Sequence, residues 1–161
     1  MKTQTIKIAL IFGMLFLSTI VFSQVNSIGG GLILETGRPP FGLHVKGTYD
    51  TDFIFEKSRI SVDVGFMFPQ TVNLRTYNRA FLNLDANYDF YSIEGFTFYA
   101  LAGLNFTYYN STISKGFLPG LTGGAGVFYK LTDSMTGYSE IKNTFFGYGE
   151  AALTFGLLFK L

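Results

Sequence analysis

His44 is the only histidine of the chain, and it is the first residue to consider for catalysis. A histidine that acts as a general base needs a nucleophile and an orienting acid within reach. Lys46, rather than a serine, stands two positions further along the chain. We therefore expect His44 to be one more polar side chain of the interior. A single histidine without any cysteine also argues against a transition-metal site.

Asp85, Asn87 and Asp89 have the Asp-x-Asn-x-Asp spacing with which a calcium-binding loop begins. The glycine and the distal glutamate of such a loop are missing here. On a β-strand all three side chains would point to one face, where we expect them to pair with lysine or arginine.

Two glycine-rich segments, 29–31 and 123–126, could in principle cradle a phosphate group. Neither is followed by a helix pattern or by Gly-Lys-Ser/Thr, which phosphate-binding loops require. Glycine within a strand serves curvature and close packing instead. The sequence therefore predicts no catalytic residue, no cofactor and no metal site, and so no enzyme.

The segments that carry these residues repeat with a period of two. At the end of the chain Leu153, Phe155, Leu157, Phe159 and Leu161 occupy every second position, with Thr154, Gly156 and Lys160 between them. Successive side chains of a β-strand point to opposite faces, so this segment has one apolar and one polar side. The pattern recurs along the chain and predicts eight strands, at Ser27–Glu35, Phe41–Tyr49, Ser58–Phe68, Arg79–Phe90, Phe96–Tyr108, Gly120–Leu131, Met135–Thr144 and Glu150–Leu161.

In each of these segments the charged residues all fall on the polar face of the alternating pattern. The set comprises six bases and six acids, namely Glu35, Lys46, Arg59, Asp63, Arg79, Asp85, Asp89, Lys130, Glu140, Lys142, Glu150 and Lys160. Buried charges are tolerated when they are paired, so a balanced set suits the closed interior of a barrel. The remaining charges after residue 23 fall in the predicted links.

Period two alone leaves open which face is inside, because a soluble lipocalin-like barrel would place the apolar side inward. The polar face also carries the small residues Gly29, Gly31, Gly42, Ser61, Gly65, Gly103, Gly124, Gly126 and Gly156. An eight-stranded barrel has an interior only just wide enough for side chains, so small residues belong there. Tyrosines near the strand ends suit the aromatic girdles of a membrane barrel. Both observations favour a transmembrane barrel with its apolar face outward.

The N-terminus has the pattern of a secretory signal peptide. Lys2 and Lys7 precede the apolar run from Ile8 to Val21, and Val21 and Ser23 supply the small residues before a cleavage site. We expect residues 1–23 to be removed and residues 24–161 to form one barrel domain. That domain has ten Lys/Arg and eleven Asp/Glu, and near-neutrality argues against nucleic acid as a partner.

The chain resembles the small porin-family outer-membrane barrels of Gram-negative bacteria, the OmpA-like and OmpX-like eight-stranded proteins. The similar segments are residues 98–106, 120–127, 130–133 and 154–161. The resemblance implies an all-β, eight-stranded antiparallel up-and-down barrel in the outer membrane. It also implies contact with outer-membrane lipids and lipopolysaccharide, and recognition of the last strand by the insertion machinery. It carries over no site residues.

In such a barrel, short turns face the periplasm and longer loops face outward. We expect residues 92–95 and 132–134 to be periplasmic turns, 50–57 to be a longer periplasmic link, and Thr36–Pro40 to interrupt the sheet because of its prolines. Residues 69–78 and 109–119 are predicted to be long extracellular loops, which could bind a ligand because loops on a rigid scaffold often do so.

The expected function is that of an integral outer-membrane protein with a closed, charge-paired interior and a structural or surface-interaction role. A narrow porin-like transport channel is the main alternative. A lipid-modifying barrel enzyme built on His44 is less favoured, because the His-x-Ser pattern of outer-membrane lipid deacylases is missing. The soluble lipocalin-like barrel is the remaining alternative.

Overall fold

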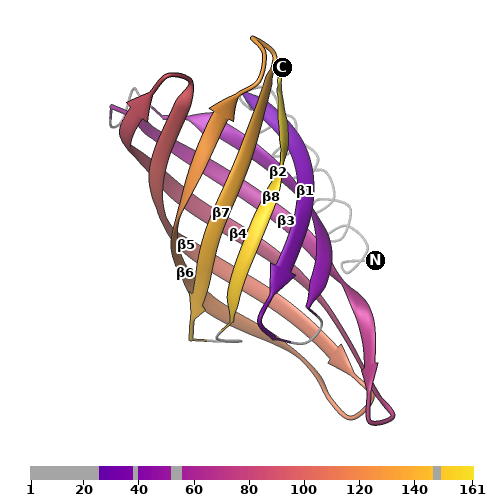
Figure 1. Cartoon of the computed structure of the whole chain (residues 1–161). Helices are drawn as coiled ribbons and strands as arrows, with labels where there is room; N and C mark the ends of the chain where they lie inside the picture. The colour runs from indigo at the N-terminus through magenta and orange to yellow at the C-terminus, as the bar shows by residue number, and fades with distance from the viewer. Residues whose placement is uncertain (1–25, 38–39, 52–55, 147–149) are drawn as a thin grey trace, which may run out of the picture.

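The computed structural model describes residues 26–37, 40–51, 56–146 and 150–161. The expected signal peptide, residues 1–23, lies outside this part of the chain. The described residues form eight antiparallel strands: β1 (Ser27–Glu35), β2 (Phe41–Asp50), β3 (Ser58–Val72), β4 (Arg75–Ile93), β5 (Phe96–Ser111), β6 (Lys115–Lys130), β7 (Met135–Phe145) and β8 (Ala151–Lys160). Each strand pairs with its neighbours in the chain, and β1 also pairs with β8, which closes the barrel (Figure 1). None of the described residues forms a helix long and apolar enough to cross a membrane.

The predicted strands are all present, but the predicted long loops are wrong. Strands β3 and β4 pair out to Val72 and Arg75, so residues 69–78 form the end of a hairpin. Strands β5 and β6 likewise pair out to Asn110 and Lys115. At about 3.3 Å per residue and a tilt of about 40°, the 19 residues of β4 reach roughly 48 Å along the barrel axis. The apolar band of such barrels is about 25 Å tall, so both hairpins extend beyond it.

The two ends of the barrel differ in shape. Ser27 pairs with Lys160, so the start of β1 and the end of β8 lie at one end of the barrel, which we call the terminal end. The β3–β4 and β5–β6 hairpins project at the other end, the hairpin end, well past the ends of β1, β2, β7 and β8 (Figure 1). The asymmetry expected from the sequence is therefore present, but paired strands rather than loops create it.

The hairpin turns explain why sequence patterns placed loops here. Asn73 and Leu74 form a two-residue turn in which both residues have positive φ, at 49° and 63°. Such turns match the twist of the flanking strands, but they favour Asn and Gly, so leucine is a poor turn signal. Pro69 and Pro119 also read as strand breakers. They lie beyond the last residues paired with β2 and β7, so no strand on that side needs an N–H donor.

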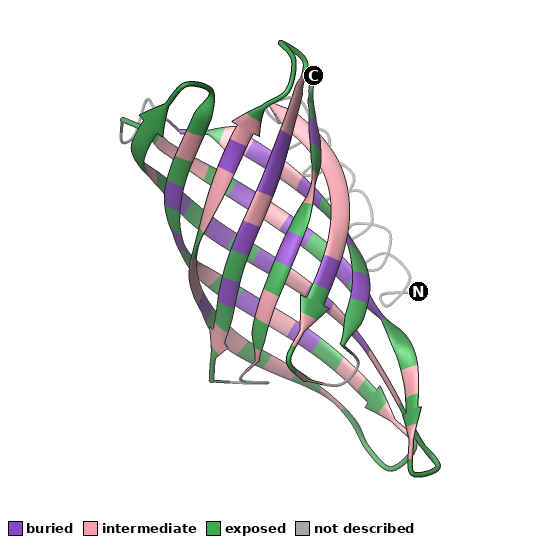
Figure 2. Ribbon diagram, in the orientation of Figure 1, coloured by how far each residue is buried: buried purple, intermediate pink, exposed green. Residues whose placement is uncertain are grey.

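The two faces of the barrel are assigned as the sequence predicted (Figure 2). Apolar side chains lie on the outside, as Val64 does with 54% of its surface exposed. Lys46 and Asp63 are fully buried in the lumen. A one-residue change of register would exchange the two faces, so the register and the placement of charges depend on each other.

Glycine is required where the barrel wall is crowded. A Cβ atom on Gly31 would lie 2.0 Å from the carbonyl oxygen of Phe155, across the seam where β1 meets β8. A Cβ atom on Gly126 would lie 2.5 Å from the ring of Tyr99 inside the lumen. Both contacts are too close for any side chain, which accounts for glycine in the two glycine-rich segments without a ligand.

A charged residue on the outer face tests the contact of that face with lipid. We expect Val64→Arg to lower the free energy of unfolding in lipid vesicles by about 2–4 kcal/mol, because it places a charge at the centre of the apolar band. Ile113→Arg is the matched control, since Ile113 is equally an exposed aliphatic residue but lies in the β5–β6 turn. Urea titrations read by the heat-dependent gel shift measure both variants. Equally small effects of the two substitutions would contradict an outer face covered by lipid.

Candidate functional site

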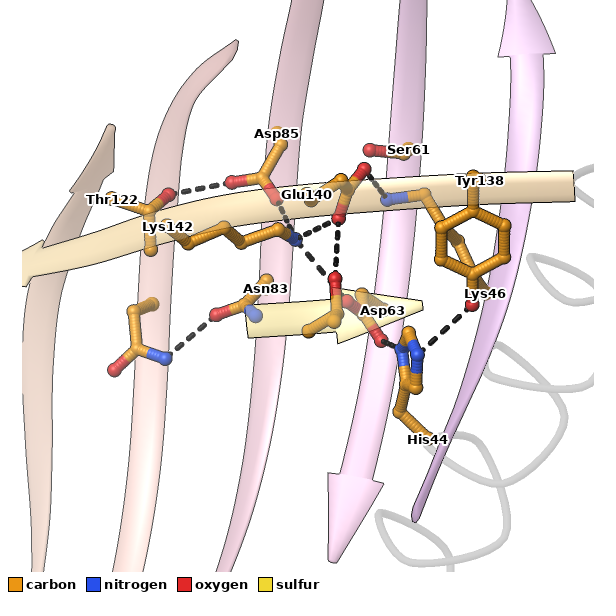
Figure 3. A network of polar contacts seen from close by, with 12 residues as sticks. His44, Lys46, Ser61, Asp63, Asn83, Asp85, Thr122, Tyr138, Glu140 and Lys142 are labelled. Carbon is orange, nitrogen blue, oxygen red and sulfur yellow. Dashed lines mark hydrogen bonds and ion pairs between the residues drawn. The ribbon is translucent and has the colours of Figure 1, made fainter. Parts of the chain in front are cut away.

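The lumen holds the densest set of interacting polar groups, and Lys142 of β7 lies at its centre (Figure 3). The Lys142 Nζ atom is 2.9 Å from Asp85 Oδ2, 3.2 Å from Asp63 Oδ2 and 3.2 Å from Glu140 Oε2. These carboxylates come from β4, β3 and β7. One ammonium group therefore ties together strands on opposite sides of the barrel.

Glu140 is surrounded by donors. Lys46 on β2 donates from Nζ to Glu140 Oε1 at 2.5 Å, and the Tyr99 hydroxyl donates to the same oxygen at 2.5 Å. The Thr154 hydroxyl donates to Glu140 Oε2 at 3.2 Å. A buried carboxylate is stable when its lone pairs are filled in this way. The predicted pairing of the inward charges is thus confirmed for the residues at the middle of the lumen.

His44 lies in the lumen between Asp63 and Tyr138 (Figure 3). Its Nδ1 atom is 2.6 Å from Asp63 Oδ1, and its Nε2 atom is 2.9 Å from the Tyr138 hydroxyl. A carboxylate only accepts hydrogen bonds, so Nδ1 carries a proton. The orienting acid that the sequence did not reveal is therefore present. Tyr138 occupies the position where a nucleophile would stand, and His44 is only 4% exposed, so its ring faces neither lipid nor solvent.

Asp85, Asn87 and Asp89 point into the lumen, as strand alternation predicted, but each has its own partner. Asp85 accepts hydrogen bonds from Lys142 and from the Thr122 hydroxyl at 2.5 Å. Asn87 donates to Ser61 at 3.1 Å, and Asp89 pairs with Arg59. They do not converge on one point. Among the described residues, no group of three or more histidine, cysteine or acidic side chains could hold a metal ion.

The inner face is not uniformly polar, and sequence analysis missed this feature. Towards the terminal end, a cluster of Tyr99, Leu101, Phe128, Tyr138 and Leu158 fills the lumen. Arg59 lies over the Phe128 ring, with its guanidinium carbon 4.2 Å from the ring centroid. Towards the hairpin end, Ile33, Met67 and Phe81 form a second cluster. Strand alternation alone places these residues on the inner face. Because they are apolar, however, the sequence analysis did not recognise them as part of the lumen.

A second ionic cluster lies near the hairpin end. Arg79 pairs with both Glu35 and Glu150, which come from β1 and from the residue before β8. Asn105 donates to Asn83 at 2.6 Å just below it. The cavity between this cluster and Lys142 has about 30 Å³ accessible to water, which is room for only a few water molecules. Polar and apolar layers together therefore plug the lumen.

Outside the apolar band, Lys130 and Asp133 form an exposed ion pair of 2.6 Å at the terminal end. The hydrogen bond and positive charge of Lys130 lower the pKa of the Asp133 carboxyl. An exposed pair of this kind adds little to stability, because water and salt screen it.

Solved structures with the same fold are known, although no family model and no curated protein sequence matches this chain. Neisserial surface protein A is 16% identical with a TM-score of 0.65, over 85% of this chain and 96% of that chain. The N-terminal β-barrel domain of Pseudomonas aeruginosa OprF is 18% identical with a TM-score of 0.63, over 85% and 98% of the two chains. Ail, the attachment invasion locus protein of Yersinia pestis, is 14% identical with a TM-score of 0.55, over 85% and 97%.

These similarities are structural and concern the whole barrel. They confirm the predicted resemblance at the level of fold: the chain is a closed, all-β, eight-stranded antiparallel up-and-down barrel of the kind seen in outer-membrane proteins. Sequence identities below one in five carry no residue roles across.

Removing the central cation tests the network. We expect Lys142→Met to lower the free energy of unfolding by about 3–5 kcal/mol, because three buried carboxylates lose a shared partner. Lys130→Met removes the same charge from the exposed pair and should leave stability unchanged. Urea unfolding in vesicles measures both variants. If Lys142→Met were as stable as Lys130→Met, the lumen charges would not hold the strands together.

Proposed function

We propose that this chain is an integral outer-membrane protein that acts as a closed scaffold and contacts the cell surroundings through its hairpin end. The observation that carries the proposal is the combination of an apolar outer face with a lumen plugged by paired charges. Water-filled channels need an open, solvated interior, and the space left near Lys142 holds only a few water molecules.

The two ends of the barrel support an orientation with the terminal end in the periplasm. Proteins of this architecture have short periplasmic turns and longer outer segments, and the projecting hairpins match the outer side. In this proposal residues 1–23 direct export, and the alternating last strand, β8, is presented to the insertion machinery. Outer-membrane lipids then surround the apolar band.

The hairpin end has features of a contact surface. Leu74 is 94% exposed at the β3–β4 tip, and Ile113 and Phe117 are exposed on the β5–β6 hairpin. Arg75 and Lys115 are the only charged residues between 68 and 78 and between 108 and 120. Positive charge without neighbouring acids suits the phosphates of lipopolysaccharide, which we propose as the partner on this side.

Leu74 adds a further indication. Its backbone has a positive φ, which is energetically unfavourable for a residue with a Cβ atom. Glycine or asparagine would fit this turn better. Backbone strain kept together with full exposure of an apolar side chain points to a role in contact rather than in folding. The two-residue turn, rather than a long loop, is therefore the part of this hairpin that we assign to binding.

Neither alternative activity gains support from the lumen. His44 is enclosed by Asp63 and Tyr138, so a lipid substrate has no path to it. The middle of the lumen holds two lysines and three carboxylates in mutual contact, whereas a selective pore usually lines its path with an excess of one sign. We therefore propose a role without catalysis and without steady transport.

Conductance tests the closed lumen. We expect the purified protein, inserted into a planar lipid bilayer, to show no steady ion-selective current, because the central network and the Tyr99 cluster block the axis. A porin reconstituted in the same bilayer is the positive control. Reproducible open-channel currents from the wild-type chain would overturn the proposal in favour of a transport pore.

Labelling of intact cells tests the orientation. The chain contains no cysteine, so Ile113→Cys and Asp133→Cys each create one thiol, at the hairpin end and the terminal end respectively. A maleimide reagent too large to cross the outer membrane should label only the first variant, and both after the membrane is permeabilised. Labelling of the second variant alone in intact cells would show that the barrel is inserted the other way round.

A further inference from the structure

The outer face contains an anomaly on β7. Its outward residues are Met135, Gly137, Ser139, Ile141, Asn143 and Phe145. Ser139 and Asn143 are each flanked by apolar or glycine positions on this row. Each of the other described strands also has an outward row of residues. Between the first and the last apolar residue of each such row, every position is apolar, proline or glycine. Two hydrogen-bonding side chains therefore interrupt the outward apolar row on one of the described strands only.

Asn143 has the greater need for a partner. Its side chain is exposed on the outer surface, and no hydrogen bond to its amide group is formed within the described residues. Lipid tails offer neither donors nor acceptors, so an amide facing them loses its hydrogen bonds to water without replacement. Polar residues inside a membrane usually face other protein groups, and among the residues that the structure describes none bonds to the Asn143 amide.

The surroundings of Asn143 allow another protein chain to approach closely. Gly123 lies beside it on β6 and Ala151 on β8, so neither neighbour covers the amide. A surface groove lined by Leu34, Ile141, Ala151 and Leu153 runs next to it, where β8 lies between β7 and β1. Ile141, with 66% of its surface exposed, stands out from this wall. A protruding side chain beside a groove is the shape that two copies of one surface can use reciprocally.

We propose that a second copy of this chain covers the outer face of β7, with the two Asn143 amides bonded to each other across a two-fold axis along the membrane normal. Such an axis places each residue at the same depth as its mate, so the two Asn143 amides meet when the axis passes beside this part of β7. An amide carries both donor and acceptor, which makes the pair self-complementary.

Cysteine crosslinking tests the contact directly, since the wild-type chain has none. Phe66 is the matched control. It lies two residues before the last apolar residue of the outward row on β3, as Asn143 does on β7. Strand β3 lies across the barrel from β7. In vesicles at high lipid-to-protein ratio, oxidised Asn143→Cys should form a disulfide-linked dimer and Phe66→Cys should not. Equal crosslinking of the two variants, or none, would overturn the proposal.

The amide itself is tested by Asn143→Leu, which keeps the side-chain size. We expect the dimer dissociation constant in lipid, measured by single-molecule photobleaching, to rise about threefold to tenfold, because one membrane-embedded hydrogen bond is lost. An unchanged constant, or a tighter dimer, would show that the amide does not bond across the interface and would overturn this part of the proposal.

The inference rests on the membrane location proposed above, and the two failures are distinguishable. A chain that stays out of vesicles and lacks the heat-dependent gel shift would contradict the proposed function. A chain that inserts, shows the gel shift and remains monomeric at every protein density would contradict the dimer alone.

Discussion

The structure depends on the pairing of charges inside a narrow ring that leaves little room for water. Lys142 contacts three carboxylates at once. Asp63 and Asp85 lie on other strands of the barrel wall, and Glu140 also pairs with Lys46. Strand residues alternate between the two faces, so fixing which residues pair inside also fixes which residues face outward. A buried network of this kind is an uncertain source of stability but a strong determinant of register, since any slip would leave charges unpaired.

The same constraint separates the rigid part of the molecule from the part available for contact. Between the two ionic clusters the lumen keeps only a small cavity, and the outer face is apolar apart from Ser139 and Asn143. Towards the hairpin end β3, β4, β5 and β6 continue without lumenal packing, because β1, β2, β7 and β8 stop earlier. Changes of sequence in the hairpins do not disturb the charge network. The exposed, basic hairpins are therefore the part of the molecule that suits recognition.

Much of this architecture was readable from the sequence, because period two and the common parity of the charged residues are strong signals. The eight strands, the closed order and the inward position of residues such as Lys46 and Asp85 are confirmed. The long loops were wrong, since Pro69 and Pro119 mark unpaired edges and Leu74 forms a turn that favours glycine. The apolar lumen layer around Tyr99 was missed because aromatic residues on the inner face imitate the outer one. The pairing of His44 with Tyr138 joins strands far apart in sequence, and local patterns carry no information about it.

The assignment of faces is the central claim, and a nitroxide scan along β3 tests it most directly. Single cysteines from Ile60 to Phe66, spin-labelled in lipid vesicles, report collision rates with oxygen, which concentrates in lipid, and with a water-soluble nickel complex. We predict oxygen maxima at residues 60, 62, 64 and 66 and low collision rates with both reagents at 61, 63 and 65. Oxygen maxima at the odd positions, or nickel maxima at the even ones, would contradict an apolar face turned to lipid around a charge-filled lumen.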